Sequence, residues 1–241
     1  MATREKANTH RMTAIIVGVL FIIGTVSGVL SGVVTIPTLE AADYLSEVAA
    51  NPSRMITGAL LVLIMGLPLA MVPVVMFPLF REHNEVLALG AVVFRGVLEA
   101  VCYMGIVIVW LLLVVLGREY VAAGAPDGSY FQTLGALLRA ASHWTEHLLA
   151  IVFSIGGLMI YALFYRSRLL PRWLSIWGFV GGLMYLVAAL VNIFDPQLPM
   201  LSVASGVGRL MAPLAVQEMF LALWLIVKGF SPAAFTPESA E

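Results

Sequence analysis

The sequence contains few charged residues, a single cysteine and no excess of basic side chains. Charged residues make up 11% of the 241 positions, against roughly 25% in a soluble domain, and hydrophobic residues make up 61%. Cys102 has no second cysteine to pair with, which excludes a disulfide-stabilised scaffold. The numbers of basic and acidic residues are 13 and 14, so nucleic acid is not an expected partner. The composition therefore indicates an integral membrane protein.

Six long apolar stretches are each long enough to cross a membrane. A bilayer core about 30 Å thick needs ~20 apolar residues, because a helix rises by about 1.5 Å per residue. We expect transmembrane helices at about 12–36, 55–80, 86–116, 143–165, 173–194 and 207–230. The predicted fold is an all-α bundle of these six helices in one domain, 1–241, with flexible tails at 1–11 and 231–241.

The lysines and arginines between these stretches predict an orientation. With the amino terminus inside, the connections and ends on the cytoplasmic side carry most of the cations, as expected for inner-membrane proteins. Both termini are therefore predicted to be cytoplasmic. The two long connections, 37–54 and 117–142, then face outward, and their apolar spacing predicts short amphipathic helices at the outer membrane surface.

Glycines recur at helical spacing in two of the stretches. Gly24, Gly28 and Gly32 share one face of the first, and Gly178 and Gly182 share one face of the fifth. Small residues at this spacing let helix backbones approach closely inside a membrane. We expect them to pack helices within the chain, although the same pattern also occurs in homodimers.

Three ionisable residues lie deep within the apolar stretches. They are Arg95, Glu99 and Glu218, and an ionisable side chain at the bilayer centre costs roughly 2.5–3.5 kcal/mol on insertion scales. Arg95 and Glu99 are one helical turn apart and share a face. We predict that Arg95 lies between Glu99 and Glu218 and joins the third helix to the sixth. Tyr103, one turn beyond Glu99, is expected to cap this cluster.

Two interpretations of the cluster are open. It is either a buried ion-pair network that fixes the register of two helices, or a polar site in a cavity that binds a small molecule or lipid or carries a proton. Replacing Arg95 by leucine separates them: a folding defect without a ligand or transport phenotype favours the first.

A second polar group lies at the predicted outer end of the fourth helix. His143 and His147 are four residues apart, so both can bind one divalent metal. With Glu146 they match the H-x-x-E-H pattern of a metallopeptidase group, in which the glutamate is a general base. The alternative is a pair of interfacial histidines beside an anchoring tryptophan. No other cofactor is predicted, since the sequence has no glycine-rich phosphate loop and no C-x-x-C motif.

Several longer strings carry a family resemblance. They are Phe80-Arg81 with His83-Asn84-Glu85, Phe94-Arg95 with Leu98-Glu99-Ala100, Tyr165-Arg166-Ser167-Arg168-Leu169 with Pro171-Arg172-Trp173-Leu174-Ser175, and Gln217-Glu218-Met219 with Leu223-Trp224. Over about 11–230 the chain resembles a bacterial family of six-helix membrane proteins, domain of unknown function 4386. The resemblance implies a protein of the bacterial cytoplasmic membrane and no particular activity. It includes Arg95, Glu99, His143 and Glu218, but not Glu146 or His147.

The functional expectation follows from the intramembrane cluster. We expect a multi-pass protein of the bacterial inner membrane that binds or moves a small molecule, lipid or proton there. The alternatives are a metal-dependent intramembrane enzyme that uses His143, Glu146 and His147, and a non-catalytic subunit of a membrane complex. The sequence leaves open whether the protein is an enzyme and whether it forms homo-oligomers.

Overall fold

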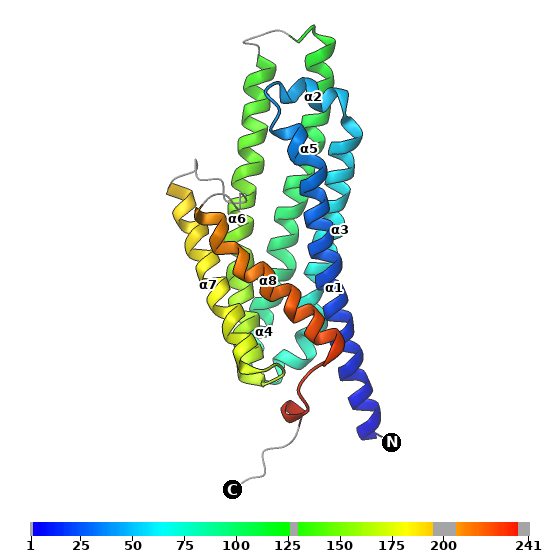
Figure 1. The fold of residues 1–241 in the computed structure, drawn as a ribbon, viewed down its shortest axis with the longest axis vertical. Helices are drawn as coiled ribbons and strands as arrows, with labels where there is room; N and C mark the ends of the chain where they lie inside the picture. Colours follow the sequence, from blue (N-terminus) through cyan, green and yellow to red (C-terminus); the bar gives the residue numbers. More distant parts are fainter. Residues whose placement is uncertain (1, 126–129, 195–205, 236–241) are drawn as a thin grey trace. The chain divides into compact units, whose positions relative to one another are not determined.

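A computed structural model describes residues 2–125, 130–194 and 206–235, and the described residues contain helices and no β-strand. Figure 1 shows the elements in chain order. They are α1 (Ala2–Leu39), α2 (Tyr44–Ala50), α3 (Pro52–Arg81), α4 (Glu85–Ala91), the π-helix η1 (Val92–Leu98), α5 (Glu99–Ala122), α6 (Tyr130–Ser167), α7 (Arg172–Phe194), α8 (Gly206–Val227) and the 3-10 helix η2 (Pro232–Phe235). The all-α prediction is confirmed.

Among the described residues, five helical segments are long and apolar enough to cross a membrane. They are Asn8–Leu39, Pro52–Arg81, Glu85–Ala122, Tyr130–Ser167 and Arg172–Phe194. The third of these joins α4, η1 and α5 without a break. The sixth predicted span, 207–230, contains the shorter apolar helix Pro213–Val227. Because lipid offers no hydrogen-bond partners, helices that satisfy their own backbone groups are the expected form for such apolar segments.

Two helices begin earlier than predicted. Helix α1 begins at Ala2 instead of about residue 12, since no glycine or proline interrupts the chain before Gly18, and the flexibility of the tail at 1–11 remains a prediction. The fourth helix begins at Tyr130 instead of about 143, so the apolar residues assigned to a separate outer helix belong to α6 itself. The carboxy-terminal tail begins with η2, and residues 236–241 lie outside the described residues.

The short helix α2 was predicted as a surface amphipathic helix, and it packs within the chain. Asp43 caps it by accepting a hydrogen bond from the backbone of Ser46 at 3.3 Å. Leu45 and Val48 are buried. The guanidinium of Arg139 on α6 lies 4.7 Å from the centre of the Tyr44 ring. Burial raises the pKa of the Tyr44 hydroxyl, and the Arg139 charge opposes that shift.

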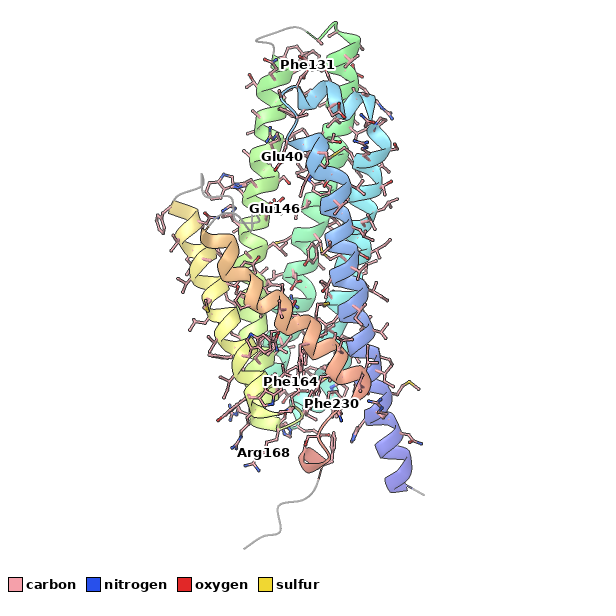
Figure 2. All side chains as sticks on the ribbon, viewed as in Figure 1. Glu40, Phe131, Glu146, Phe164, Arg168 and Phe230 are labelled. Carbon is pink, nitrogen blue, oxygen red and sulfur yellow. The ribbon has the colours of Figure 1, made fainter. Side chains whose placement is uncertain are left out.

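The chain folds into two compact units, each with its own core. Unit 1 comprises Met1–Ile22, Pro68–Glu99 and Ala150–Glu241, and unit 2 comprises Ile23–Leu67 and Ala100–Leu149. In unit 1, Phe80 and Phe164 pack edge to face with ring centres 5.0 Å apart, and Phe164 can be followed in Figure 2. In unit 2, Met55 and Leu113 are buried. The prediction of a single domain remains a prediction.

Glycines make close helix contacts within both units. A Cβ atom at Gly28 in α1 would lie 2.5 Å from the Met65 sulfur in α3. A Cβ atom at Gly178 in α7 would overlap the ring of Tyr161 in α6. Two of the predicted glycines therefore contact other helices of the same chain, as expected for small residues in helix interfaces.

Candidate functional site

The intramembrane cluster is built on a local change of helix type. Between Val92 and Leu98 the backbone forms a π-helix, in which the Glu99 N–H donates to the Phe94 carbonyl five residues earlier. Such wider turns inside α-helices are rare and occur frequently at functional sites. Arg95 lies in the middle of this turn, and Glu99 begins α5 directly after it.

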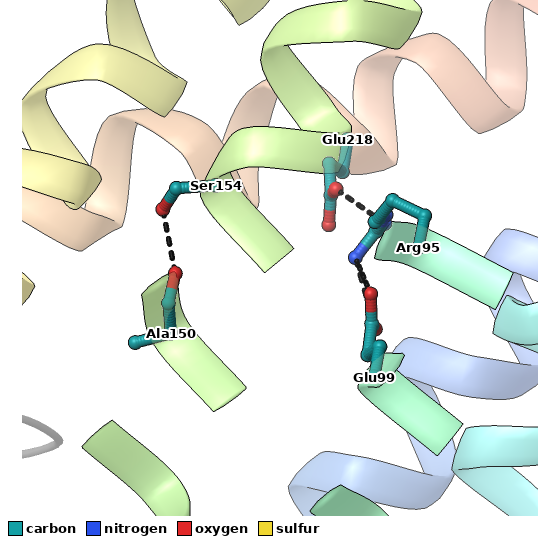
Figure 3. A network of polar contacts seen from close by, with 5 residues as sticks. All are labelled: Arg95, Glu99, Ala150, Ser154 and Glu218. Atoms are coloured by element: carbon teal, nitrogen blue, oxygen red, sulfur yellow. Dashed lines mark hydrogen bonds and ion pairs between the residues drawn. The ribbon is translucent and has the colours of Figure 1, made fainter. Parts of the chain in front are cut away.

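Arg95 bridges the two carboxylates. Its Nη1 atom donates to both oxygens of Glu99, at 3.0 and 2.9 Å, and its Nη2 atom donates to Oε1 of Glu218 on α8 at 3.1 Å. Figure 3 shows the guanidinium between the two acids. The exposed fractions of the Arg95, Glu99 and Glu218 side chains are 2%, 1% and 14%. This is the arrangement that the sequence spacing predicted, whereas its role as a ligand site remains a prediction.

Helix α6 forms the wall behind Arg95. The guanidinium carbon lies 4.0 Å from the centre of the Phe153 ring, a cation–π distance. One turn further along α6, a Cβ atom at Gly156 would lie 2.8 Å from the Arg95 backbone nitrogen, so only glycine allows this approach. The Ser154 hydroxyl donates to the Ala150 carbonyl at 2.7 Å (Figure 3). A hydroxyl has one proton, so the proton of Ser154 is already donated to its own helix.

The cluster contains two carboxylates and one guanidinium. Glu218 shares the Arg95 guanidinium with Glu99, so one cation serves two carboxylates. Among the described residues, no side chain or backbone group donates to the Glu218 Oε2 atom. Glu218 is also the most exposed member of the cluster. Glu99 thus accepts two hydrogen bonds from Arg95, whereas Glu218 accepts one.

A second set of hydrogen bonds fixes the helix that carries Glu218. The Tyr161 hydroxyl on α6 donates to Oε1 of Gln217 at 2.7 Å, and Nε2 of Gln217 donates to the Leu174 carbonyl on α7 at 3.2 Å. Gln217 is fully buried and precedes Glu218. This network was not predicted from the sequence, although a glutamine next to an intramembrane glutamate in an apolar stretch was a signal for it.

Tyr103 was expected to cap the cluster. It belongs to unit 2, where its ring packs against Gly66 of α3. A Cβ atom at Gly66 would lie 2.8 Å from the Tyr103 ring. The capping role remains a prediction.

The histidine motif in unit 2 has a different arrangement. The His143 and His147 rings are 4.4 Å apart, and the His147 Nδ1 atom lies 2.7 Å from the His143 carbonyl oxygen. Glu146 instead accepts from the Ser142 hydroxyl at 3.3 Å, and this hydroxyl accepts from Trp110 Nε1 at 3.2 Å. Within 2–125, 130–194 and 206–235, no three His, Cys, Asp or Glu side chains are placed to hold a metal. A third metal ligand is therefore not found for this motif among those residues.

The fold and the charged cluster define an all-helical, multi-pass membrane protein. The chain belongs to the family described as Domain of unknown function (DUF4386), whose model matches residues 16–229. The matched range includes Arg95, Glu99 and Glu218, and the family prediction is confirmed. No curated protein matches the chain, and no solved structure matches it.

Proposed function

We propose that this protein is a six-span protein of the bacterial inner membrane, with both termini in the cytoplasm, that binds or moves a small molecule, lipid or proton at the Arg95–Glu99–Glu218 cluster. Among these ligands we propose a proton, held at Glu218. The observation that carries the proposal is that Glu218 shares its guanidinium partner with Glu99. With both acids ionised the three side chains carry one surplus negative charge, which a low-dielectric interior disfavours.

The geometry supports different roles for the two acids. Glu99 is 1% exposed and binds Arg95 through both oxygens, so the two form a neutral pair that stays together. Glu218 is 14% exposed and binds Arg95 through one oxygen. A proton on the free oxygen of Glu218 makes the cluster neutral. Loss of that proton leaves a charge that the neighbouring guanidinium stabilises, and this permits reversible binding.

Infrared difference spectroscopy of the reconstituted protein tests this proposal. The difference between spectra recorded at acidic and at alkaline pH is expected to contain a protonated-carboxyl band that is absent from the difference spectrum of E218Q. E146Q is the matched control, because Glu146 is a membrane-segment carboxylate in the other unit. A band that persists unchanged in E218Q would contradict proton binding at Glu218. A second measurement distinguishes proton movement from proton binding alone. If the protein moves protons, liposomes that contain it should lose a pH gradient faster than empty liposomes do, and E218Q should abolish this difference.

The orientation is supported by the distribution of lysines and arginines. Carboxy-terminal fusions to a fluorescent protein and to periplasmic alkaline phosphatase test it directly. A fluorescent and phosphatase-negative result is expected for six spans with a cytoplasmic amino terminus. The reverse pattern would contradict an even number of spans with that orientation.

The two alternative functions have separate tests. Metal analysis of the purified protein is expected to find about one Zn or Fe per chain if the His143, Glu146 and His147 motif holds a metal. An accessory subunit is expected to co-purify with fixed partner chains at unit ratio.

A further inference from the structure

A second site lies in unit 1, in the groove between α6 and α7. The groove has a volume of about 350 Å³, which is within the roughly 300–1,000 Å³ of small-molecule pockets. Tyr161, Ala162 and Arg166 line it from α6, and Ser175 and Phe179 line it from α7. Most of its wall is apolar, and Arg166 lies near the end where α6 and α7 are linked.

That end of the groove carries several positive charges. Between Glu146 and Asp195 the chain has no acidic residue, whereas the link between α6 and α7 holds three arginines: Arg166, Arg168 and Arg172. Arg168 is marked in Figure 2. The guanidinium carbon of Arg172 lies 5.5 Å from the ring centre of Tyr165, which lines the groove. Neither Arg166 nor Arg172 forms an ion pair with any residue that the structure describes.

Ser175 adds an unused hydrogen-bond group inside the groove. Its side chain is fully buried, and its Oγ atom has no hydrogen-bond partner among the described residues. A buried hydroxyl without a partner is unfavourable, and native proteins seldom keep one unless a ligand or a water binds it. Ser175 thus points to a bound polar group.

The order of these side chains along α7 gives the class of ligand. Arg172, Ser175 and Phe179 are at i, i+3 and i+7 and share one helix face. Ser175 lies ~4.5 Å deeper than Arg172, at about 1.5 Å per residue. From the link inward, the groove presents the Arg166 cation, with Arg172 next to its Tyr165 wall, then a hydroxyl, then apolar side chains. A glycerophospholipid presents a phosphate, then an ester carbonyl, then acyl chains in the same order.

We infer that the groove binds an anionic glycerophospholipid. Arg166 and Arg172 bind the phosphate, the Ser175 hydroxyl donates to an ester carbonyl, and one acyl chain lies against Ala162 and Phe179. Basic pockets between transmembrane helices bind lipid headgroups in this manner. The inference is independent of the function proposed for Glu218, since it uses none of the residues of that cluster.

Native mass spectrometry of the full chain in detergent tests the inference, with phosphatidylglycerol and phosphatidylcholine of identical acyl chains as probes. We expect tighter binding of phosphatidylglycerol. The R166Q/R172Q variant is expected to lose roughly fivefold in affinity for each arginine removed, since such a charge contributes ~1 kcal/mol near an anionic surface. The control variant R54Q/R118Q removes two arginines of unit 2 and is expected to bind as the wild type does.

Two further variants test the depth of the site. S175A is expected to weaken binding of both lipids without changing the preference between them, and A162W, which fills the groove, is expected to reduce binding at least tenfold. Equal binding of the two lipids, or wild-type affinity in R166Q/R172Q or in A162W, would overturn the inference. Full competition by glycerol 3-phosphate would also overturn it, because the site would then bind free phosphate compounds instead of lipid. S175A removes only one oxygen atom, so it still tests the site if the bulkier A162W variant does not fold.

Discussion

Two neighbouring glycines of α6 offer a matched test of the close approach between α6 and η1. A Cβ atom at Gly156 would lie 2.6 Å from Cγ and 2.8 Å from the backbone nitrogen of Arg95, and 3.0 Å from Cβ of Phe94. A Cβ atom at Gly157 would meet its nearest neighbour, the Tyr161 ring, at 4.0 Å. Alanine therefore fits at Gly157 and collides with the π-helix at Gly156.

The expected difference in stability follows from two opposing effects. Alanine is better than glycine in a helix interior by roughly 0.5–1 kcal/mol, and both variants gain this amount. Only Gly156→Ala also suffers overpacking, which costs about 1–3 kcal/mol. The cost falls on Gly156 because one neighbour is a backbone atom, which cannot rotate away as a side chain can. The free energy of unfolding should therefore be lower in Gly156→Ala than in Gly157→Ala by about 1–3 kcal/mol.

Thermal unfolding in one detergent measures this difference. For chains of this length 1 kcal/mol corresponds to roughly 2–4 °C, so Gly156→Ala should have a Tm about 2–12 °C below that of Gly157→Ala. Equal Tm values for the two variants would refute the close packing of α6 against η1. Since the collision is with Arg95 itself, Gly156→Ala should also alter the carboxyl band of Glu218, whereas Gly157→Ala should leave it unchanged.

Two further predictions concern the buried polar groups of unit 1. Arg95→Leu leaves both carboxylates of the cluster without their cation and should reduce the free energy of unfolding by about 3–5 kcal/mol; a loss under ~1 kcal/mol, measured by thermal unfolding, would contradict the bridging role. If the cluster were only structural, replacing all three of its members by leucine should restore near wild-type stability. Tyr161→Phe leaves the Gln217 side-chain oxygen without its donor and should cost roughly 1–3 kcal/mol, whereas Tyr130→Phe, at an exposed tyrosine, should change Tm little; equal effects of the two changes would argue against the network.

Local physical chemistry explains why much of the fold was predictable. Long apolar stretches must be helical in a membrane, so 173–194 agrees closely with α7, Arg172–Phe194. The high cost of intramembrane charge is enough to single out Arg95, Glu99 and Glu218 in the sequence. Helical periodicity placed Arg95 and Glu99 on one face. The beginning of α6 was less predictable. The helix begins at Tyr130, and its first residues are a mixture of polar and apolar side chains, so hydrophobicity alone does not mark where it starts.

The sequence by itself determined the helical class, most of the apolar segments and which charges needed partners, since these depend on composition and local spacing. Only the tertiary structure decided the detailed contacts between distant residues. Arg95 and Glu218 are 123 positions apart, and although the cost of intramembrane charge predicted that they pair, only the structure decided which atoms bind and that Gln217 joins Tyr161 to the Leu174 carbonyl. The π-turn around Arg95 and the unused hydroxyl of Ser175 depend on how α6, α7 and α8 pack against their neighbours. Packing, unlike helix formation, depends on the shapes of many side chains that meet only in the folded chain.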